Sequence, residues 1–338
     1  MHDELKKRAR IARLILGIGM LLISPPAKAA APTALRIAYP APTASFLPLW
    51  AAQEAGFFKK HDLSVELIQV GSSTRGMAAL IAGQVDILAG GGTGGIVAQL
   101  QGFTDLAIFG TNVHTWVFSV YAGPAINDVA QLRGKKLGVT RFGGTMDFAA
   151  RYFLRQRGLE PGKDVALIQV GAPQDIVTAL ANGVVDAGVM SVPYVFFARR
   201  LGLRELADLS QGGIRYAQAA LVAKRSFLKN KQDVVARFIK ASIEATYFIK
   251  NRPEDGMRIL GRYTRTEDVE ILKLAYDYHV HKLLSAVPDI RADDVKLLLE
   301  EAVQSNPKAK GANPRDFIDE MPVREVVRSG FVEQIYKK

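Results

Sequence analysis

Small, hydroxylated and glycine residues gather directly before several expected helices, where a protein can offer hydrogen-bond donors to a ligand. The densest run is 90–95, in which five of six residues are glycine. Helix N-termini present free N–H groups and a partial positive charge, which suits an anion or a polarised oxygen. One such turn, at Ser72, Ser73 or Thr145, is ordinary N-capping. Several converging turns predict a ligand site.

The predicted ligand-binding residues share one feature: they lie at the carboxyl ends of expected strands, where open parallel sheets bind ligands. They are Ser45, Phe46, Ser72, Ser73, Gly91, Gly92, Thr93, Asn112, Arg141, Gly143, Gly144, Thr145, Gln174, Pro193 and Tyr194. Arg141 is either an exposed loop arginine or a charged donor to a carboxylate, sulfonate or nitrate-like group. Candidates for an apolar wall are Phe46, Trp50, Trp116, Phe142 and Tyr194. Trp50 lies in a helical apolar stripe, which favours a core position.

Cysteine is absent from the chain, and the histidines offer little support for a metal site. The chain has no cysteine, which excludes disulfides, thiolate metal sites and a cysteine nucleophile. His279 and His281 are two residues apart on an expected helix and do not share a face, which argues against metal binding. His114 stays a candidate ligand contact. We expect no catalytic residue, no metal and no cofactor.

The chain carries a formal net charge of +11, to which residues 1–29 contribute six Lys or Arg and two Asp or Glu. The remaining basic residues are scattered among acids and form no basic stripe with aromatics. This pattern does not favour nucleic-acid binding. It predicts a solvated basic surface or, alternatively, a mild attraction for anionic solutes.

Residues 1–29 predict a signal peptide. A basic stretch at 6–13 is followed by an uncharged run at 14–23 and by Ala-Lys-Ala at 27–29, a small-x-small cleavage site. The uncharged run has ten residues, whereas a bilayer-spanning helix needs roughly 20. We expect cleavage near Ala29 and export to the periplasm. Without a cysteine there is no lipoprotein anchor, so the mature chain is expected to be soluble.

An internal repeat is the most informative feature of the chain. Residues 65–90 match 165–190 at an offset of 100 without a gap, and eleven of the 26 positions are identical. Each copy ends in Gly-x-Val-Asp, at 83–86 and 183–186. Two copies indicate a duplicated lobe, because a solenoid needs three or more repeats.

Each repeat unit predicts the same strand and helix order. The expected strands are 35–39, 65–70 and 85–89 in the first copy and 136–140, 165–170 and 185–190 in the second, with long helices at 45–58 and 145–157. The short helix before the third strand ends at Gly83 or Gly183, which suits a left-handed stop. Further helices are expected at 233–250, 267–285, 293–304 and within 316–336.

Strands that alternate with helices imply parallel βαβ units. We therefore expect an α/β fold of two lobes, each with a central, mostly parallel sheet, and a hinge between them. Lobe I is predicted to comprise 30–118 and 219–338, which includes the C-terminal helices, and lobe II to comprise 119–218. The chain is expected to cross between the lobes near 111–122 and near 215–223.

Four segments resemble the nitrate/sulfonate/taurine-type solute-binding proteins of ABC importers, within the thiamine-precursor-binding-like superfamily. They are 35–39 (LRIAY), 55–66 (AGFFKKHDLSVE), 83–86 (GQVD) and 132–139 (LRGKKLGV). The resemblance covers about 33–250 and implies the periplasmic-binding-protein type II fold, a cleft that closes on its ligand, and delivery to a membrane permease. It places ligand contacts on loops that begin at Ser45, Ser72, Gly91, Asn112, Gly143 and Tyr194.

The loop at 141–145 (RFGGT) departs from the family's usual Gly-Ser/Thr pair at Phe142 and Gly144, which leaves sulfonate or nitrate specificity open. The function expected is an extracytoplasmic, monomeric solute-binding protein for a small organic or oxyanionic ligand, with a permease as partner and no nucleic acid. Two alternatives remain. One is a sensory clamshell, and the other is an enzyme that resembles the thiamine-pyrimidine synthases.

Overall fold

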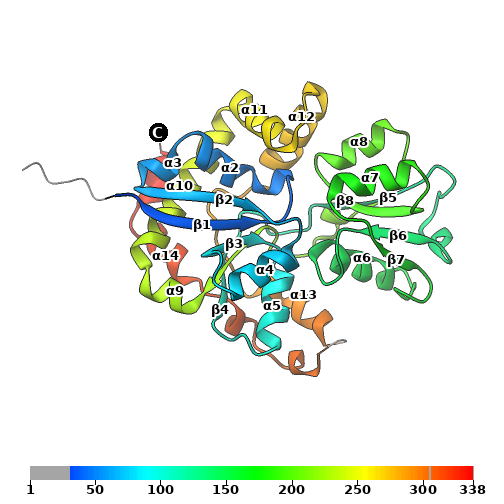
Figure 1. Ribbon diagram of the computed structural model, residues 1–338, viewed down its shortest axis with the longest axis horizontal. Coiled ribbons are helices and arrows are strands. Elements are labelled where there is room, and N and C mark those ends of the chain that lie inside the picture. The colour runs from blue at the N-terminus through cyan, green and yellow to red at the C-terminus, as the bar shows by residue number, and fades with distance from the viewer. Residues whose placement is uncertain (1–30, 304–305, 338) are drawn as a thin grey trace, which may run out of the picture. The chain divides into compact units, whose positions relative to one another are not determined.

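The computed structural model describes residues 31–303 and 306–337. The predicted signal peptide and its cleavage site lie outside these residues. Two five-stranded sheets form the framework, and helices surround each of them (Figure 1). Four strands are buried along their whole length: Ile87–Gly90, Leu106–Gly110, Phe118–Ala122 and Ala187–Ser191. Their burial explains why they are near-continuous apolar runs in the sequence.

The first sheet contains four strands that run in one direction and one that runs against them. Its order is β2 (Leu63–Gln69), β1 (Thr33–Tyr39), β3 (Ile87–Gly90), β10 (Ala220–Lys224) and β4 (Leu106–Gly110). β1 pairs in parallel with β2 and β3, whereas β10 is antiparallel to both β3 and β4.

The second sheet repeats this arrangement. Its order is β7 (Ala166–Gln169), β6 (Lys136–Val139), β8 (Ala187–Ser191), β5 (Phe118–Ala122) and β9 (Arg204–Asp208). β6 is parallel to β7 and β8, and β5 is antiparallel to β8 and β9. The two repeat copies therefore lie in different sheets, and the predicted α/β fold with two mostly parallel sheets is confirmed.

Helices connect the parallel strands in both halves. They are α2 (Leu47–Glu54), α3 (Phe57–Lys60), α4 (Ser73–Ile81) and α5 (Gly92–Leu100) around the first sheet, and α6 (Thr145–Gln156), α7 (Pro173–Ala181) and α8 (Tyr194–Arg200) around the second. Gly83 and Gly183 have φ of 72° and 69°, as expected of left-handed helix stops. The single helix expected at 45–58 is wrong: Gly56, at φ 75°, separates α2 from α3.

The C-terminal third is helical and packs against the first half. It contains α9 (Arg225–Asn230), α10 (Gln232–Asn251), α11 (Pro253–Thr264), α12 (Val269–Tyr276), α13 (Asp293–Ala302), α14 (Met321–Arg328) and α15 (Phe331–Tyr336). α10 contacts α2, α3 and α14, and α13 contacts α5. The helix expected at 267–285 is shorter than predicted, because α12 passes into one π turn at Asp277–His281 and regular structure then stops.

Two segments connect the sheets. One runs from β4 to β5 over 111–117, and the other from β9 to β10 over 209–219. They pair with each other, since the Gln218 amide donates to the Val113 carbonyl at 3.0 Å and the Tyr216 amide donates to the His114 carbonyl at 3.0 Å. These segments lie where crossings were expected. The lobe limits of 30–118 with 219–338, and of 119–218, stay a prediction.

Residues 285–294 are hydrogen-bonded to both crossing segments, and we call this stretch the strap. The Ser285 amide donates to the Asn112 carbonyl at 2.7 Å, and the Thr111 amide donates to the Asp289 carbonyl at 3.0 Å. The Ala217 amide donates to the Asp294 carbonyl at 2.9 Å. The segment that leads into the C-terminal helix α13 is thus tied to both crossing segments through backbone hydrogen bonds.

Charged side chains reinforce this strap. His114 Nε2 lies 3.0 Å from Asp289 Oδ1, and His114 Nδ1 lies 3.1 Å from the fully buried Asp294 Oδ1. Arg215 and Arg291 complete the cluster by pairing with Asp294 and Asp289, at 2.7 and 3.0 Å. Burial alone would lower the pKa of His114, but the two carboxylates outweigh it and raise this pKa to about 9. The His114 hydrogen bond in turn lowers the pKa of Asp289.

Candidate functional site

A cavity of about 50 Å³ lies where the carboxyl ends of strands from both sheets meet. The first half lines it with Pro40, Ala41, Thr43, Phe46, Gly71, Ser72, Ser73 and Gly91; the second half with Phe118, Thr140, Thr145, Met146, Pro173 and Ser191; and a crossing segment with Gln218. We call this the inner cavity. None of its lining residues is ionisable, so its walls offer hydroxyl, amide and apolar groups only.

Three helix N-termini open on the inner cavity. α4 begins at Ser73, α6 at Thr145 and α7 at Pro173, and each of these residues lines the cavity. A Cβ on Gly144, the N-cap of α6, would lie 3.6 Å from Ser73 Oγ, so the N-termini of α4 and α6 are close neighbours. Free N–H groups at these termini can donate to a ligand oxygen.

Buried polar atoms in and beside the inner cavity have no hydrogen-bond partner. They include Gln218 Oε1 in the lining and Ser45 Oγ, which is buried in the same loop as Phe46. Thr145 Oγ1 also lacks a hydrogen bond of good geometry, although it lies near the hydroxyl of Tyr216. Buried polar groups are normally paired, so these atoms are expected to bond a guest.

Gly91 brings the two halves into close contact at the inner cavity. A Cβ at this position would lie 1.8 Å from Thr145 Oγ1 and 3.0 Å from Thr145 Cβ. Any other residue would therefore force Thr145 and α6 away from the first half. Further ties cross nearby, as the Ala44 amide donates to the Val192 carbonyl at 3.2 Å and the Tyr194 hydroxyl donates to the Pro42 carbonyl at 3.2 Å.

Five of the fifteen predicted ligand-binding residues line the inner cavity: Phe46, Ser72, Ser73, Gly91 and Thr145. The structure assigns other hydrogen bonds to several of the rest. Thr93 Oγ1 pairs with the Tyr216 hydroxyl at 2.8 Å, the Gly92 amide donates to Ala217, and Asn112 Nδ2 donates to the Ser285 carbonyl.

The remaining predicted residues lie around the cavity rather than in its wall. Ser45, Gly144, Pro193 and Tyr194 are buried close to it, Gly143 and Gln174 are exposed, and Arg141 lines an adjoining hollow. Burial raises the pKa of Tyr194 to about 12, so its hydroxyl stays neutral. Of the aromatic candidates, Trp50 and Trp116 are fully buried core residues and Phe142 is exposed. His114 belongs to the strap cluster.

Several lining residues were not identified from the sequence. Phe118 begins β5 directly after one crossing segment, and Gln218 lies in the other; the approach of both to the cavity depends on the tertiary fold. Gly71, Thr140 and Pro173 directly precede or follow predicted residues, so a window one residue wider would have included them. Met146 is the second residue of α6 and was hidden among the apolar positions of that helix.

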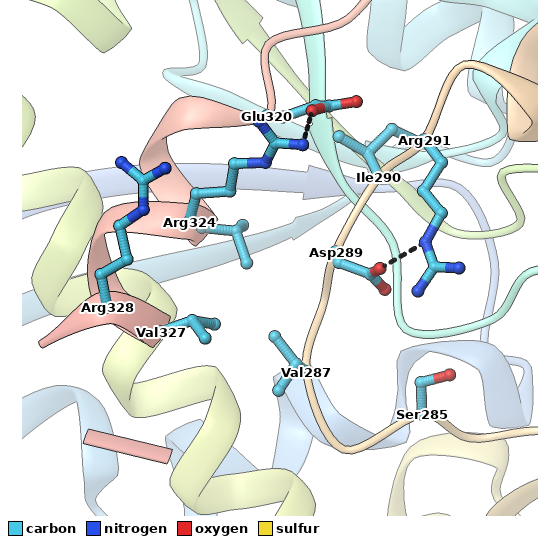
Figure 2. Close-up of a pocket in the computed structure, with 10 residues that line it drawn as sticks. Ser285, Val287, Asp289, Ile290, Arg291, Glu320, Arg324, Val327 and Arg328 are labelled. Atoms are coloured by element: carbon cyan, nitrogen blue, oxygen red, sulfur yellow. Dashed lines mark hydrogen bonds and ion pairs between the residues drawn. The ribbon is translucent and has the colours of Figure 1, made fainter. Parts of the chain in front are cut away.

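A larger cavity of about 680 Å³ lies elsewhere, between the strap and α14 (Figure 2). Val287, Ile290, Val323 and Val327 contribute apolar groups to it, and three arginines surround them. Two of these arginines are paired, Arg291 with Asp289 at 3.0 Å and Arg324 with Glu320 at 2.7 Å. No strand end or repeat helix contributes to this cavity, so it is not the predicted ligand site despite its volume.

Comparison with known proteins agrees with this architecture. The family model described as "NMT1/THI5 like" matches residues 43–256, which is more than half of the chain. The chain belongs to the NMT1/THI5-like family. The match covers the second repeat copy, the first copy apart from its opening strand β1, both crossing segments and every residue of the inner cavity except Pro40 and Ala41.

Individual NMT1/THI5-like relatives fall into two groups. A putative binding protein of Bacillus subtilis, YtlA, is 27% identical over 210 residues, which are 61% of this chain and 63% of that protein. A 4-amino-5-hydroxymethyl-2-methylpyrimidine phosphate synthase of Saccharomyces cerevisiae, THI13, is 23% identical over 231 residues, covering 63% of this chain and 65% of that one. The chain therefore spans just under two thirds of these relatives.

Solved structures match a larger share of the chain than these relatives do. The periplasmic nitrate-binding protein NrtA of Synechocystis PCC 6803 superposes with a TM-score of 0.74 at 17% identity, over 88% of this chain and 89% of that one. This similarity confirms the periplasmic-binding-protein fold predicted from the sequence. Within 31–303 and 306–337, no helix is long and apolar enough to cross a membrane, and no group of three or more His, Cys, Asp or Glu is placed to hold a metal ion.

Proposed function

We propose that this chain is an extracytoplasmic solute-binding protein that captures a small organic or oxyanionic ligand between its two halves and delivers it to an ABC importer. The observation that carries this proposal is the inner cavity, to which both sheets contribute the carboxyl ends of their strands and three helix N-termini. A ligand that contacts both halves at once stabilises their association, because each half supplies only part of the wall.

The enzyme alternative has less support. General acid–base catalysis needs a titratable group within hydrogen-bond reach of the reacting atoms, and Schiff-base chemistry needs a lysine. The inner cavity has neither, since none of its lining residues is ionisable. The chain also lacks the cysteines expected of a synthase of the thiamine-pyrimidine type. Binding without chemistry therefore fits this site better than catalysis.

A sensory clamshell would use the same site, and its binding behaviour would be identical. The two roles differ in the partner of the chain. In an importer the chain works with a permease and an ATPase, whereas in a sensor it works with a kinase or a receptor. The genes adjacent to this one separate them. We propose the importer, with a monomeric chain in the periplasm, because the family resemblance and the predicted export signal both favour it.

A ligand panel tests the proposed function. We expect at least one member of a panel of sulfonates, nitrate, aromatic carboxylates and pyrimidines to raise the unfolding temperature of the chain that begins at Ala30. A ligand present at about a hundred times its Kd adds about 2.7 kcal/mol to the free energy of unfolding. Thermal-shift measurements detect such a change directly. A flat response to all four classes would contradict small-solute binding of this kind.

A further inference from the structure

A wider hollow of about 380 Å³ adjoins the inner cavity and shares Gly71, Ser72 and Thr140 with it. We call this the outer hollow. Its other lining residues are Arg75, Arg141, Gln169, Val170, Gly171 and Ala172. These three shared residues make the two spaces immediate neighbours, and the outer hollow offers the room that the inner cavity, at about 50 Å³, lacks for the bulk of a ligand.

Charge is distributed unequally between the two spaces. The outer hollow is lined by two arginines and no acid, whereas the inner cavity has no ionisable lining residue. Across the described residues, neither the Arg75 nor the Arg141 guanidinium has a hydrogen bond or an ion pair, although the chain carries many such pairs elsewhere. The Asp175 carboxylate lies beside Gly171 of the lining and accepts the Ala172 amide at 2.8 Å.

The two arginines approach the hollow from different halves of the molecule. Arg75 lies in the first turn of α4, and its Nη1 would be 3.3 Å from a Cβ on Gly71. Arg141 follows β6 in the second half, directly after Thr140. An anionic group between them would be bound by both halves, and guanidinium groups suit a carboxylate or sulfonate because they donate two parallel hydrogen bonds.

We infer that the ligand is an organic anion bound in one orientation, with a small neutral group in the inner cavity of about 50 Å³ and its anionic group in the outer hollow between Arg75 and Arg141. This inference rests on the proposed function and names its ligand class. If the anionic group were bound in the inner cavity instead, no cationic side chain would contact it, and Arg75 and Arg141 would both stay unpaired. In the inferred orientation, the helix N-termini of the inner cavity serve neutral oxygens of the small neutral group.

Three matched pairs of probes test this orientation: benzoate with benzamide, nicotinate with nicotinamide, and butanesulfonate with butanesulfonamide. Each pair keeps the body and removes the charge. In calorimetric titration we expect the best anion to bind more tightly than its neutral partner, and the difference to shrink at high salt because partly exposed charges are screened. Arg141→Ala should weaken that anion by roughly 10- to 150-fold. Arg75 is more exposed, so Arg75→Ala should cost a few-fold.

A control variant and separate outcomes make the test decisive. Arg328→Ala removes an exposed arginine that lines the large cavity beside α14 (Figure 2), and it should leave affinity unchanged. If Arg328→Ala weakened the affinity for the anion as much as Arg141→Ala does, the loss would come from the lower net charge of the protein alone, and the inference would be overturned. If the neutral probes bind as tightly as the anions, solute binding stands and the orientation is wrong. If no probe binds in the wild type, the proposed function fails and the inference fails with it.

Discussion

Gly91→Ala is expected to reduce ligand affinity by roughly 5- to 150-fold while the protein still folds. The added Cβ would lie 1.8 Å from Thr145 Oγ1, so the two halves must separate before both side chains fit. Overpacking of this kind costs about 1–3 kcal/mol, and here the cost falls on the arrangement that encloses the ligand. The backbone of Gly91, at φ −73° and ψ 142°, accepts alanine without strain.

Calorimetry with the best ligand of the panel measures this effect, and Gly94→Ala is its matched control. Gly94 lies in α5, the helix that Gly91 caps, but a Cβ on Gly94 would lie 3.7 Å from its nearest neighbour. Gly94→Ala should therefore bind as the wild type does. If Gly91→Ala retains full affinity, the contact between Gly91 and Thr145 is not part of the ligand-bound state.

The free energy of unfolding is expected to fall by on the order of 3 kcal/mol as the pH rises from about 6.5 to above 9. The cause is His114, whose pKa is about 9 in the folded protein because Asp289 and Asp294 flank it. Between these pH values the folded state holds a proton that the unfolded state has released. The stabilisation is therefore fully present below pH 6.5 and is lost as the pH rises through 9.

Urea unfolding at a series of pH values measures this dependence, with His114→Gln as the comparison. Glutamine can still donate to one carboxylate but carries no charge, so its unfolding free energy should change far less over the same interval. Arg215 and Arg291, which also face the two aspartates, are present in both proteins, so the comparison isolates His114. Parallel slopes in wild type and variant would show that His114 does not couple the strap to the crossing segments.

The fold was predictable because its signals are local and repeated. Apolar runs such as those of β3 and β8 are long enough to identify buried strands, and Gly83 and Gly183 are placed where a left-handed stop is needed. An offset of 100 residues then showed that one unit occurs twice. The break at Gly56 was missed because apolar periodicity continues across it, and only the backbone conformation ends the helix.

The site was predictable only in part, for a physical reason. Strand ends meet at one edge of a sheet, so Ser72, Gly91 and Thr145 could be placed from strand order alone. Gln218 reaches the cavity because two distant segments cross side by side, which no local pattern encodes. Arg75 was missed because it lies inside the first turn of α4, beyond the strand end where ligand contacts were expected.

The central claim is that the ligand binds between the two halves and holds them together, and a distance measurement tests it most directly. The chain has no cysteine, so spin labels attached through Lys59→Cys and Lys163→Cys are free of background labelling. Lys59 lies in α3 of the first half, and Lys163 precedes β7 in the second; both are exposed.

Double electron–electron resonance on this labelled pair reports the distribution of distances between the halves. With a saturating amount of the best panel ligand, we predict a narrower distribution than without it, because a ligand bound to both halves restricts motion at the hinge. The same experiment in the Gly91→Ala background should show less narrowing. An unchanged distribution in a sample shown by calorimetry to be saturated would contradict binding between the halves.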